Sequence, residues 1–262
     1  MNLMDWDFTT KTYLALLKTF QSEGYCILSF DDYILHKNQT CDSLVILRHD
    51  VDKKPFNALR MAQVESSIGV FSTYYFRTTD DSNEIAIMSE IADLGHHIGY
   101  HYREFSSARG DFDEAIRQFK ENLEKMRKQF TINTICMDGS PASQWDNRDL
   151  WGKFNYKDFG IIAEPYFDIN YEEVLYLTDT GRCWNGEKYS VRDKVESGLI
   201  FNVHSTFDII HALQNHLLPQ KLMLNAHPQR WVNSPFFWLE EYIMQNIRNQ
   251  IKKMFFVKMK II

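Results

Sequence analysis

Short apolar runs alternate along the chain with longer segments in which apolar residues recur every three or four positions. The runs are rich in β-branched and aromatic residues, which is typical of buried strands, whereas the longer spacing is typical of helices with one buried face. Strands are predicted at 25–30, 44–50, 71–77, 96–101 and 131–137, and helices at 9–22, 55–69, 84–95 and 111–129. Strands that alternate in this way with helices indicate β/α units and a largely parallel sheet.

Length and composition fit one α/β domain. The chain has 262 residues, of which 44% are hydrophobic and 15% aromatic, so it can bury a large core. No internal repeat and no linker rich in Pro, Gly or Ser interrupts the alternation. We therefore expect a single domain over residues 1–262, with functional side chains at the points where strands end.

Charge and cysteine content narrow the class of protein. The net charge of −6 argues against a protein that binds the phosphate backbone of nucleic acids. The first residues, MNLMDWDFTT, carry acids where a signal peptide has bases, and no run approaches the roughly 20 apolar residues of a membrane span. The four cysteines are Cys26, Cys41, Cys136 and Cys183, which are scattered without CxxC spacing. We therefore expect them to be reduced thiols in a cytoplasmic protein.

Two aspartates follow an apolar strand in the stretch LVILRHDVDKKP. Because side chains alternate along a strand, Asp50 and Asp52 are predicted to share one face while Val51 points to the other. Neighbouring carboxylates repel unless a cation neutralises them, or unless one carries a proton and acts as a base with a raised pKa. The alternative is an Asp-rich turn that caps the helix after Pro55, with Arg48 as the neutralising charge.

Histidines follow two other strand-like runs. GHHIGYHY contains His96, His97 and His101, and imidazole together with carboxylate is the usual ligand set of a catalytic divalent metal such as zinc. In LMLNAHPQRW, His227 has a side chain whose pKa suits a general acid at neutral pH. The alternatives are loop or core histidines bonded to the backbone for the first group, and a cap of the turn before Pro228 for His227.

These segments also carry a resemblance to a known family. In order along the chain, RHDVDKKPFNALRMA, STYYFR, GHHIGYHY and LMLNAHPQRW resemble the polysaccharide deacetylases of carbohydrate esterase family four. IAEPYFDI (162–169) and LTDTGRCWNG (177–186) extend the resemblance, which is closest to a cytosolic branch found in surface-polysaccharide and O-antigen (lipopolysaccharide) biosynthesis. It implies a distorted (β/α)7–8 barrel and metal-dependent hydrolysis of an acetyl or formyl group. The substrate that it implies is an amino sugar or its activated or lipid-linked form.

The resemblance also implies roles for individual residues. By motif, Asp50 is the general base, His227 the general acid, and Asp52 and His101 are ligands of a divalent metal, for which zinc is the expected ion. Typical members carry a second histidine ligand four residues after the one that matches His101, and here that position is Phe105. The third ligand is therefore open.

Two residues are candidates for the third ligand. His97 forms an H-x-x-x-H pair with His101, although it does not align with the family motif. Asp138, in MDGSPASQWDN, lies after the strand at 131–137 and is alternatively a turn residue before Gly139.

Substrate-binding residues are expected around the mouth of the barrel, where these strands end. Arg182 and Arg230 are candidates to hold an anionic group such as a phosphate, because guanidinium offers a bidentate fork; the alternative is structural ion pairs. Trp184 and Trp231 are candidates to stack on a sugar ring, or else core residues. His204 ends another short apolar run and is expected to line the mouth, without an assigned role.

The C-terminal stretch at about 236–262 is predicted to be a basic amphipathic helix. Apolar residues recur at helical spacing, and after Glu241 the charged residues are all positive, which suits peripheral contact with the anionic surface of an inner membrane. The alternative is a helix that packs on the barrel and ends in a frayed basic tail.

Two functions from different classes follow. The first is a metal-dependent hydrolase of a sugar amide, and hydrolysis of a non-sugar amide uses the same groups. The second is a degenerate relative that binds a glycan, a nucleotide sugar or a partner protein without hydrolysis, which the loss of a histidine ligand at Phe105 favours.

Overall fold

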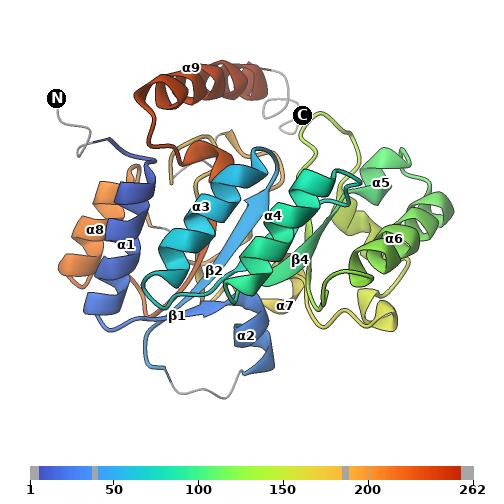
Figure 1. Ribbon diagram of the computed structural model, residues 1–262, viewed down its shortest axis with the longest axis horizontal. Coiled ribbons are helices and arrows are strands. Elements are labelled where there is room, and N and C mark those ends of the chain that lie inside the picture. Colours follow the sequence, from blue (N-terminus) through green and yellow to red (C-terminus); the bar gives the residue numbers. More distant parts are fainter. Residues whose placement is uncertain (1–5, 37–40, 185–188, 200, 255–262) are drawn as a thin grey trace.

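The computed structural model describes residues 6–36, 41–184, 189–199 and 201–254. Seven parallel strands form one sheet in the order β5-β4-β3-β2-β7-β6, with β1 also beside β2 (Figure 1). The strands are β1 (Cys26–Ser29), β2 (Leu44–Val51), β3 (Thr73–Phe76), β4 (His97–Tyr102), β5 (Ile135–Met137), β6 (Leu175–Thr178) and β7 (Lys221–Ala226). On one edge of β2, β1 pairs with the first half and β3 with the second half, so the carboxyl end of β2 lies between β3 and β7.

Helices follow most of the strands and cover the outside of the sheet (Figure 1). They are α1 (Thr10–Ser22), α2 (Phe30–Leu35), α3 (Pro55–Ser66), α4 (Ser82–Asp93), α5 (Glu104–Ser107), α6 (Phe112–Arg127), α7 (Pro165–Asp168), α8 (Thr206–Gln214) and α9 (Pro235–Lys252). The predicted cap of the first helix is confirmed, since the side chain of Thr9 accepts a hydrogen bond from the backbone of Thr12. The predicted strands and helices are all present, and the largest difference is at 131–137, where only Ile135–Met137 is a strand.

Every residue of β2 is buried, because the two faces of this strand pack against different cores. Val45 and Leu47 point outward, into a cluster with side chains of α1 and α8. Ile46 points inward, to a cluster that also contains Tyr75 of β3 and Met223 of β7. Apolar burial of this kind contributes about 25 cal/mol per Å², so both faces of the strand drive folding.

The sheet therefore encloses an interior of its own, as in a barrel that is not fully closed. No pairing joins β5 to β6 in the described residues. In the gap, Ala163 forms a parallel bridge with Thr134, and Tyr171 packs into the inner cluster with Ala163. The predicted fold, a distorted β/α barrel with seven strands, is confirmed.

Helix α9 crosses the end of the barrel toward which the β2 arrow points (Figure 1). The amide of Asn249 donates a hydrogen bond to the carbonyl of Gly181, 2.8 Å away, in the loop after β6. The predicted C-terminal helix is thus present from Pro235 to Lys252, while residues 255–262 of the prediction lie outside the described residues.

The expectation of four reduced thiols is wrong. Cys26 and Cys41 form a disulfide, with their Cα atoms 6.3 Å apart, whereas Cys136 and Cys183 are free and buried. The register of the parallel pair explains this contact, since Cys26 lies opposite Leu44 and the chain reaches β2 through Cys41. Disulfides persist in oxidising compartments, so cysteine content no longer supports the expected cytoplasmic location.

None of the helices in the described parts of the chain combines the length and the apolar character needed to cross a membrane.

Candidate functional site

A cavity of about 280 Å³ opens at the carboxyl ends of the strands, beneath α9. In barrels of parallel strands this end collects the side chains that follow the strands, so one cavity receives residues far apart in sequence. Its lining includes the predicted base, acid and ligands, which are Asp50, His227, Asp52, His101 and Asp138. It also includes the predicted substrate-binding residue Arg230 and three side chains of α9, which are Gln245, Arg248 and Lys252.

Three side chains on this lining form a metal-ligand set. Asp52 follows β2, His101 lies near the end of β4, and Asp138 follows β5. One ligand atom from each lies within 4.8 Å of the others, and Nε2 of His101 is 3.6 Å from Oδ1 of Asp52. Nδ1 of His101 donates a hydrogen bond to the carbonyl of Cys136 at 3.0 Å, which leaves Nε2 as the ligand atom. This donor set fits a divalent cation such as zinc.

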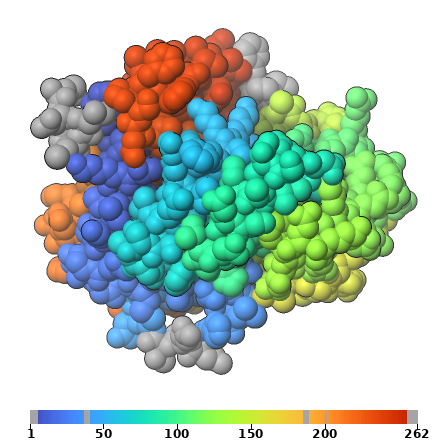
Figure 2. Space-filling view, in the orientation of Figure 1, coloured from blue at the N-terminus to red at the C-terminus, as the bar shows by residue number. Residues whose placement is uncertain are grey.

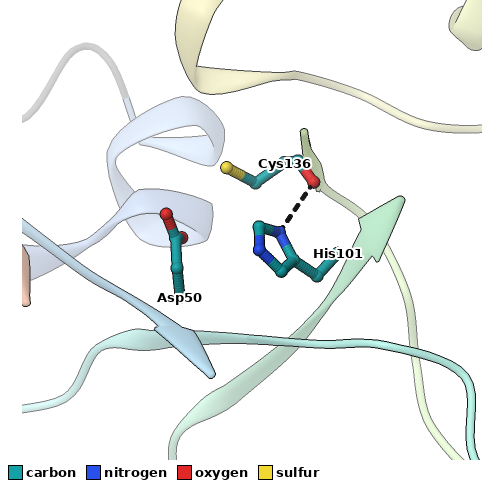
Figure 3. A group of neighbouring side chains, drawn as sticks. All are labelled: Asp50, His101 and Cys136. Carbon is teal, nitrogen blue, oxygen red and sulfur yellow. Dashed lines mark hydrogen bonds between the residues drawn. The ribbon is translucent and has the colours of Figure 1, made fainter. Parts of the chain in front are cut away.

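Asp50, His101 and Cys136 form a second group with ligand atoms within 4.8 Å (Figure 3). Figure 3 shows the ring of His101 turned toward Asp50, with its hydrogen bond to the carbonyl of Cys136. Burial raises the pKa of the Cys136 thiol well above its usual range, and a metal ligand must be a thiolate. The group with Asp52 and Asp138 is therefore the better metal site.

The third ligand is better supplied by Asp138 than by His97. His97 and His101 share a face of β4, but four residues separate them by about 13 Å, so His97 lies at the other end of the barrel. There its Nε2 is 3.3 Å from Oδ1 of Asp32. Phe105 is buried in the outer core, which accounts for the missing histidine. Asp138 also has the alternative turn role, because its Oδ1 accepts a hydrogen bond from the backbone of Ser140.

Arg77 lies against two of the candidate ligands. Its Nη2 is 3.1 Å from Oδ1 of Asp52 and 2.5 Å from Oδ2 of Asp138. Burial opposes charge on Asp52, but the hydrogen bond with His101 and the charges of His227 and Arg77 hold its pKa below the usual range. A deprotonated Asp52 is the state that binds a metal, and a bound ion would share both carboxylates with Arg77.

Asp50 has two partners in the wall of the cavity. Oδ1 accepts a hydrogen bond from Arg48 at 2.5 Å, and Oδ2 accepts one from the amide of Asn225 at 2.9 Å. Arg48 thus neutralises Asp50, as the alternative interpretation held, yet Asp50 still lines the cavity together with Asp52. Val51 packs on the other face, in the outer core, as predicted.

His227 pairs with an aspartate that no motif singled out. Its Nδ1 donates to Oδ1 of Asp179 at 2.6 Å, and its backbone amide donates to Oδ2 at 3.0 Å. Arg230 and the indole of Trp231 also donate to Asp179. The bond to Asp179 fixes the tautomer of His227. His227 is also the N-cap residue of the turn Pro228–Arg230, as the alternative held, but its side chain makes no capping bond. Asp179 is the first charged residue after β6, and the strand-end rule that marked Asp50 also identifies it.

A second missed carboxylate, Asp193, lines the cavity between β6 and the metal-ligand set. It accepts hydrogen bonds from Tyr166, Tyr176 and Thr178 at 2.8, 2.5 and 2.8 Å. Burial disfavours its charge, but His227, Arg48 and these hydrogen bonds lower its pKa. Asp193 does not follow directly on any strand of the described residues, so the strand-end rule does not mark it.

Most of the predicted substrate-binding residues are not brought to the cavity. Arg230 lines it, but Arg182 lies with its guanidinium 4.2 Å from the ring centroid of Trp238 in α9. Trp184 and Trp231 are buried in the outer core with α1 and α8.

His204 is exposed, with its backbone amide bonded to Asp208 at the start of α8. It is not among the residues that line the cavity.

Basic side chains dominate the rim under α9. Arg248 and Lys252 of α9 and Arg230 line the same cavity. The side chain of Lys252 has no hydrogen bond or ion pair to another described residue, and burial together with the charges of Arg230 and Arg248 lowers its pKa. Arg230 is paired with Asp179 and Arg248 with Glu241, so Lys252 is the one of these three cations that is left without an acid partner among the described residues and is open to an anionic ligand.

Comparisons with known proteins give distant similarities. No protein-family model and no curated protein matches the sequence. Among solved structures, the chain is similar to a CE4 esterase from Streptococcus mutans, at 13% identity and a TM-score of 0.47, with 89% of this chain and 91% of that chain covered. It is also similar to a family 4 carbohydrate esterase from Bacillus anthracis, at 14% identity and a TM-score of 0.40, with 94% and 89% covered.

A CE4 family pseudoenzyme from Bacillus anthracis is similar as well, at 10% identity and a TM-score of 0.43, with 79% of this chain and 62% of that chain covered. Similarities of this size do not assign an activity. The function is therefore argued from the cavity.

Proposed function

We propose that the protein is a metal-dependent hydrolase that removes an acetyl or formyl group from the nitrogen of an amino sugar in surface-polysaccharide biosynthesis. The observation that carries this proposal is the set of Asp52, His101 and Asp138, placed in one cavity with Asp50 and His227. Carboxylate and imidazole ligands beside a base and an acid are the groups that amide hydrolysis needs.

Asp52, His101 and Asp138 would hold a divalent ion, which would polarise the acyl carbonyl and lower the pKa of a water molecule. Asp50 accepts the proton of the attacking water, and its bonds to Arg48 fix the carboxylate in place. His227 donates a proton from Nε2 to the departing amine.

Asp179 positions His227 for this step by accepting its Nδ1–H.

The basic rim supports a substrate with a phosphate, such as an activated or lipid-linked sugar. Arg230, Arg248 and Lys252 face the same cavity as the acid and the base. A phosphate is the anionic group that arginine and lysine bind most readily in such sites.

Metal content is the first test. The purified protein is expected to carry about one divalent ion per chain in elemental analysis, and Asp52→Ala is expected to lose it. Asp80→Ala is the matched control, since the Asp80 side chain is 92% exposed and outside the cavity. A protein without a bound ion, or an unchanged ion content in Asp52→Ala, contradicts the proposal.

Activity is the second test. Acetate and formate release is measured over a panel of amino sugars with and without phosphate groups. Asp50→Asn is expected to lower turnover by about 10²- to 10⁴-fold, the usual contribution of a general base. Equal turnover in the variant removes Asp50 from the mechanism.

A second candidate function is binding of a glycan, a nucleotide sugar or a partner protein without hydrolysis. Arg77 favours it, because this guanidinium already neutralises Asp52 and Asp138. If it holds, the protein contains no ion, and Arg77→Ala restores metal binding without lowering the affinity for the sugar.

A further inference from the structure

Helix α9 has its polar face inside and its apolar face outside. The buried residues of this helix are Glu241, Gln245 and Asn249, which are spaced four apart and face the barrel. Trp238 is half-buried, but the other large apolar side chains of α9 and Met254 just after it are 43% to 73% exposed: Phe236, Phe237, Leu239, Tyr242, Ile243, Met244, Ile247, Ile251 and Met254. A helix packed on a globular core shows the reverse arrangement. Figure 2 shows α9, in red, as a ridge at one end of the molecule.

Polar contacts from the barrel fix this orientation. Glu241 lies 3.6 Å from Nζ of Lys54, and the amide of Asn249 donates to the carbonyl of Gly181. The indole of Trp238 donates to the carbonyl of Asp7 at 2.7 Å. Rotation of the apolar face toward the barrel would break these bonds and bury polar groups without partners, which is costly.

The charge around α9 is opposite to that of the whole chain. Three basic and two acidic residues follow Pro235 within the described residues, and the sequence adds Lys258 and Lys260 outside them, whereas the chain as a whole has a net charge of −6. Glu241, one of the two acids, is buried and paired with Lys54 and with Arg248. Lys253 is exposed beside the apolar face, and Arg248 and Lys252 are half-buried. Two copies of this helix placed face to face would bring like charges together, whereas an anionic surface complements them.

We propose that the outer face of α9, defined by Ile243, Ile247 and Ile251 with the exposed apolar residues around them, docks on an anionic lipid bilayer. A helix with an apolar stripe and a basic flank lies in the plane of the interface, with the stripe among the acyl chains and the cations at the headgroups. Arg248 and Lys252 of the same helix line the cavity, so docking places the mouth of the cavity beside the headgroups. The proposal does not depend on the metal or on hydrolysis.

Vesicle binding tests the apolar face directly. The full-length protein is sedimented with vesicles of phosphatidylcholine and phosphatidylglycerol, and with vesicles of phosphatidylcholine alone. The triple variant Ile243→Ser, Ile247→Ser and Ile251→Ser is expected to bind the anionic vesicles at least about tenfold more weakly, with an unchanged unfolding midpoint because these side chains are exposed. Leu217→Ser, at an exposed leucine after α8, is the matched control and is expected to bind as the native protein does.

The charge is tested by Lys253→Glu, which is expected to weaken binding to anionic vesicles by about fivefold or more and to leave binding to neutral vesicles unchanged. No sedimentation of the native protein, equal binding by the triple variant, or equal binding to both vesicle types overturns the proposal. A native dimer that the triple variant turns into a monomer, without vesicle binding, assigns the face to a second copy and overturns it as well. Vesicle binding needs no substrate, so its failure is distinguishable from failure of the proposed activity.

Discussion

Two clusters of carboxylates and histidines lie on opposite faces of the sheet. In the outer cluster, Oε1 of Glu65 is 2.5 Å from the hydroxyl of Tyr13 and 2.7 Å from Nε2 of His49. Its Oε2 accepts bonds from Ser72 and Tyr74 at 2.7 and 3.0 Å. Glu65 is fully buried, and both of its carboxylate oxygens bond to side chains around it. This cluster therefore stabilises the packing of α1 and α3 on the sheet.

The inner cluster uses the same residue types but faces a cavity. Asp52, His101 and Asp138 have ligand atoms near one another and line the cavity. Near them, the side-chain oxygens of Asn225 and Gln229 are buried without a partner among the described residues. Alternation along β2 separates the clusters, since His49 points outward and Asp50 inward. Residue type therefore does not identify a functional site, whereas access to a cavity does.

The largest expected difference between the clusters is in turnover. His227→Asn is expected to lower N-acyl hydrolysis by about 10²- to 10⁴-fold, because the proton donor to the amine is lost. His96→Asn is the matched variant, since His96 is a buried histidine whose ring bonds to Ser72 and Ala62 in the outer cluster. It is expected to lower stability and to leave turnover per folded molecule unchanged. Similar turnover losses in both variants would remove the functional distinction.

Stability is expected to fall more when a residue of the outer cluster is changed than when a residue of the inner cluster is changed. Glu65→Gln should lower the free energy of unfolding by about 3–5 kcal/mol, because it removes one member of a buried charged network. Asp138→Asn should change it by about 1 kcal/mol or less, since Arg77 is 32% exposed and can turn to water, while metal affinity falls by more than the roughly 10- to 100-fold that loss of a residue merely supporting a ligand causes. Denaturant unfolding and metal titration measure the two effects. Equal stability losses would mean that Asp138 is structural.

The pH dependence of stability gives the smallest effect. Burial opposes charge on Glu65, but His49 and His96 and the bond from Tyr13 lower its pKa to about 2 from the usual 4.5. A lowered carboxyl pKa contributes stability that is present above about pH 4.5 and lost as the pH falls toward 2. The native protein should lose on the order of 2–3 kcal/mol over this range that Glu65→Gln does not lose. Parallel stability curves for the two proteins would contradict this assignment.

Local pattern explains most of what was predicted. The strand 44–50 and the inward face of Asp50 and Asp52 follow from alternation, which depends only on neighbouring residues. His101 and His227 follow from the rule that polar residues after parallel strands meet at one end of the barrel. Asp179 also follows a strand, but the segment that contains it, LTDTGRCWNG, was not predicted to begin on a strand, so the rule did not single it out.

Other features depended on contacts between distant segments. His97 and Asp138 were equal candidates for the third ligand until the length of β4 placed His97 at the opposite end of the barrel from His101. Arg77, on the loop after β3, reaches Asp52 across the sheet, and no spacing in the sequence marks that pair. That Arg182 does not line the cavity was also decided only by the structure, which places its guanidinium against Trp238 of α9.

The sequence by itself determined the alternation of strands and helices and the two aspartates at the end of β2, because hydrophobic periodicity acts between near neighbours, whereas the barrel was expected from the resemblance of its motifs to a known family. Only the tertiary structure decided that Asp138 lies with Asp52 and His101, that Cys26 meets Cys41, and that α9 turns its apolar face outward. These outcomes depend on which surfaces the folded chain brings together. The amphipathic pattern of α9 marks its two faces, but the partners of Glu241 and Asn249 on the barrel decide which face is buried.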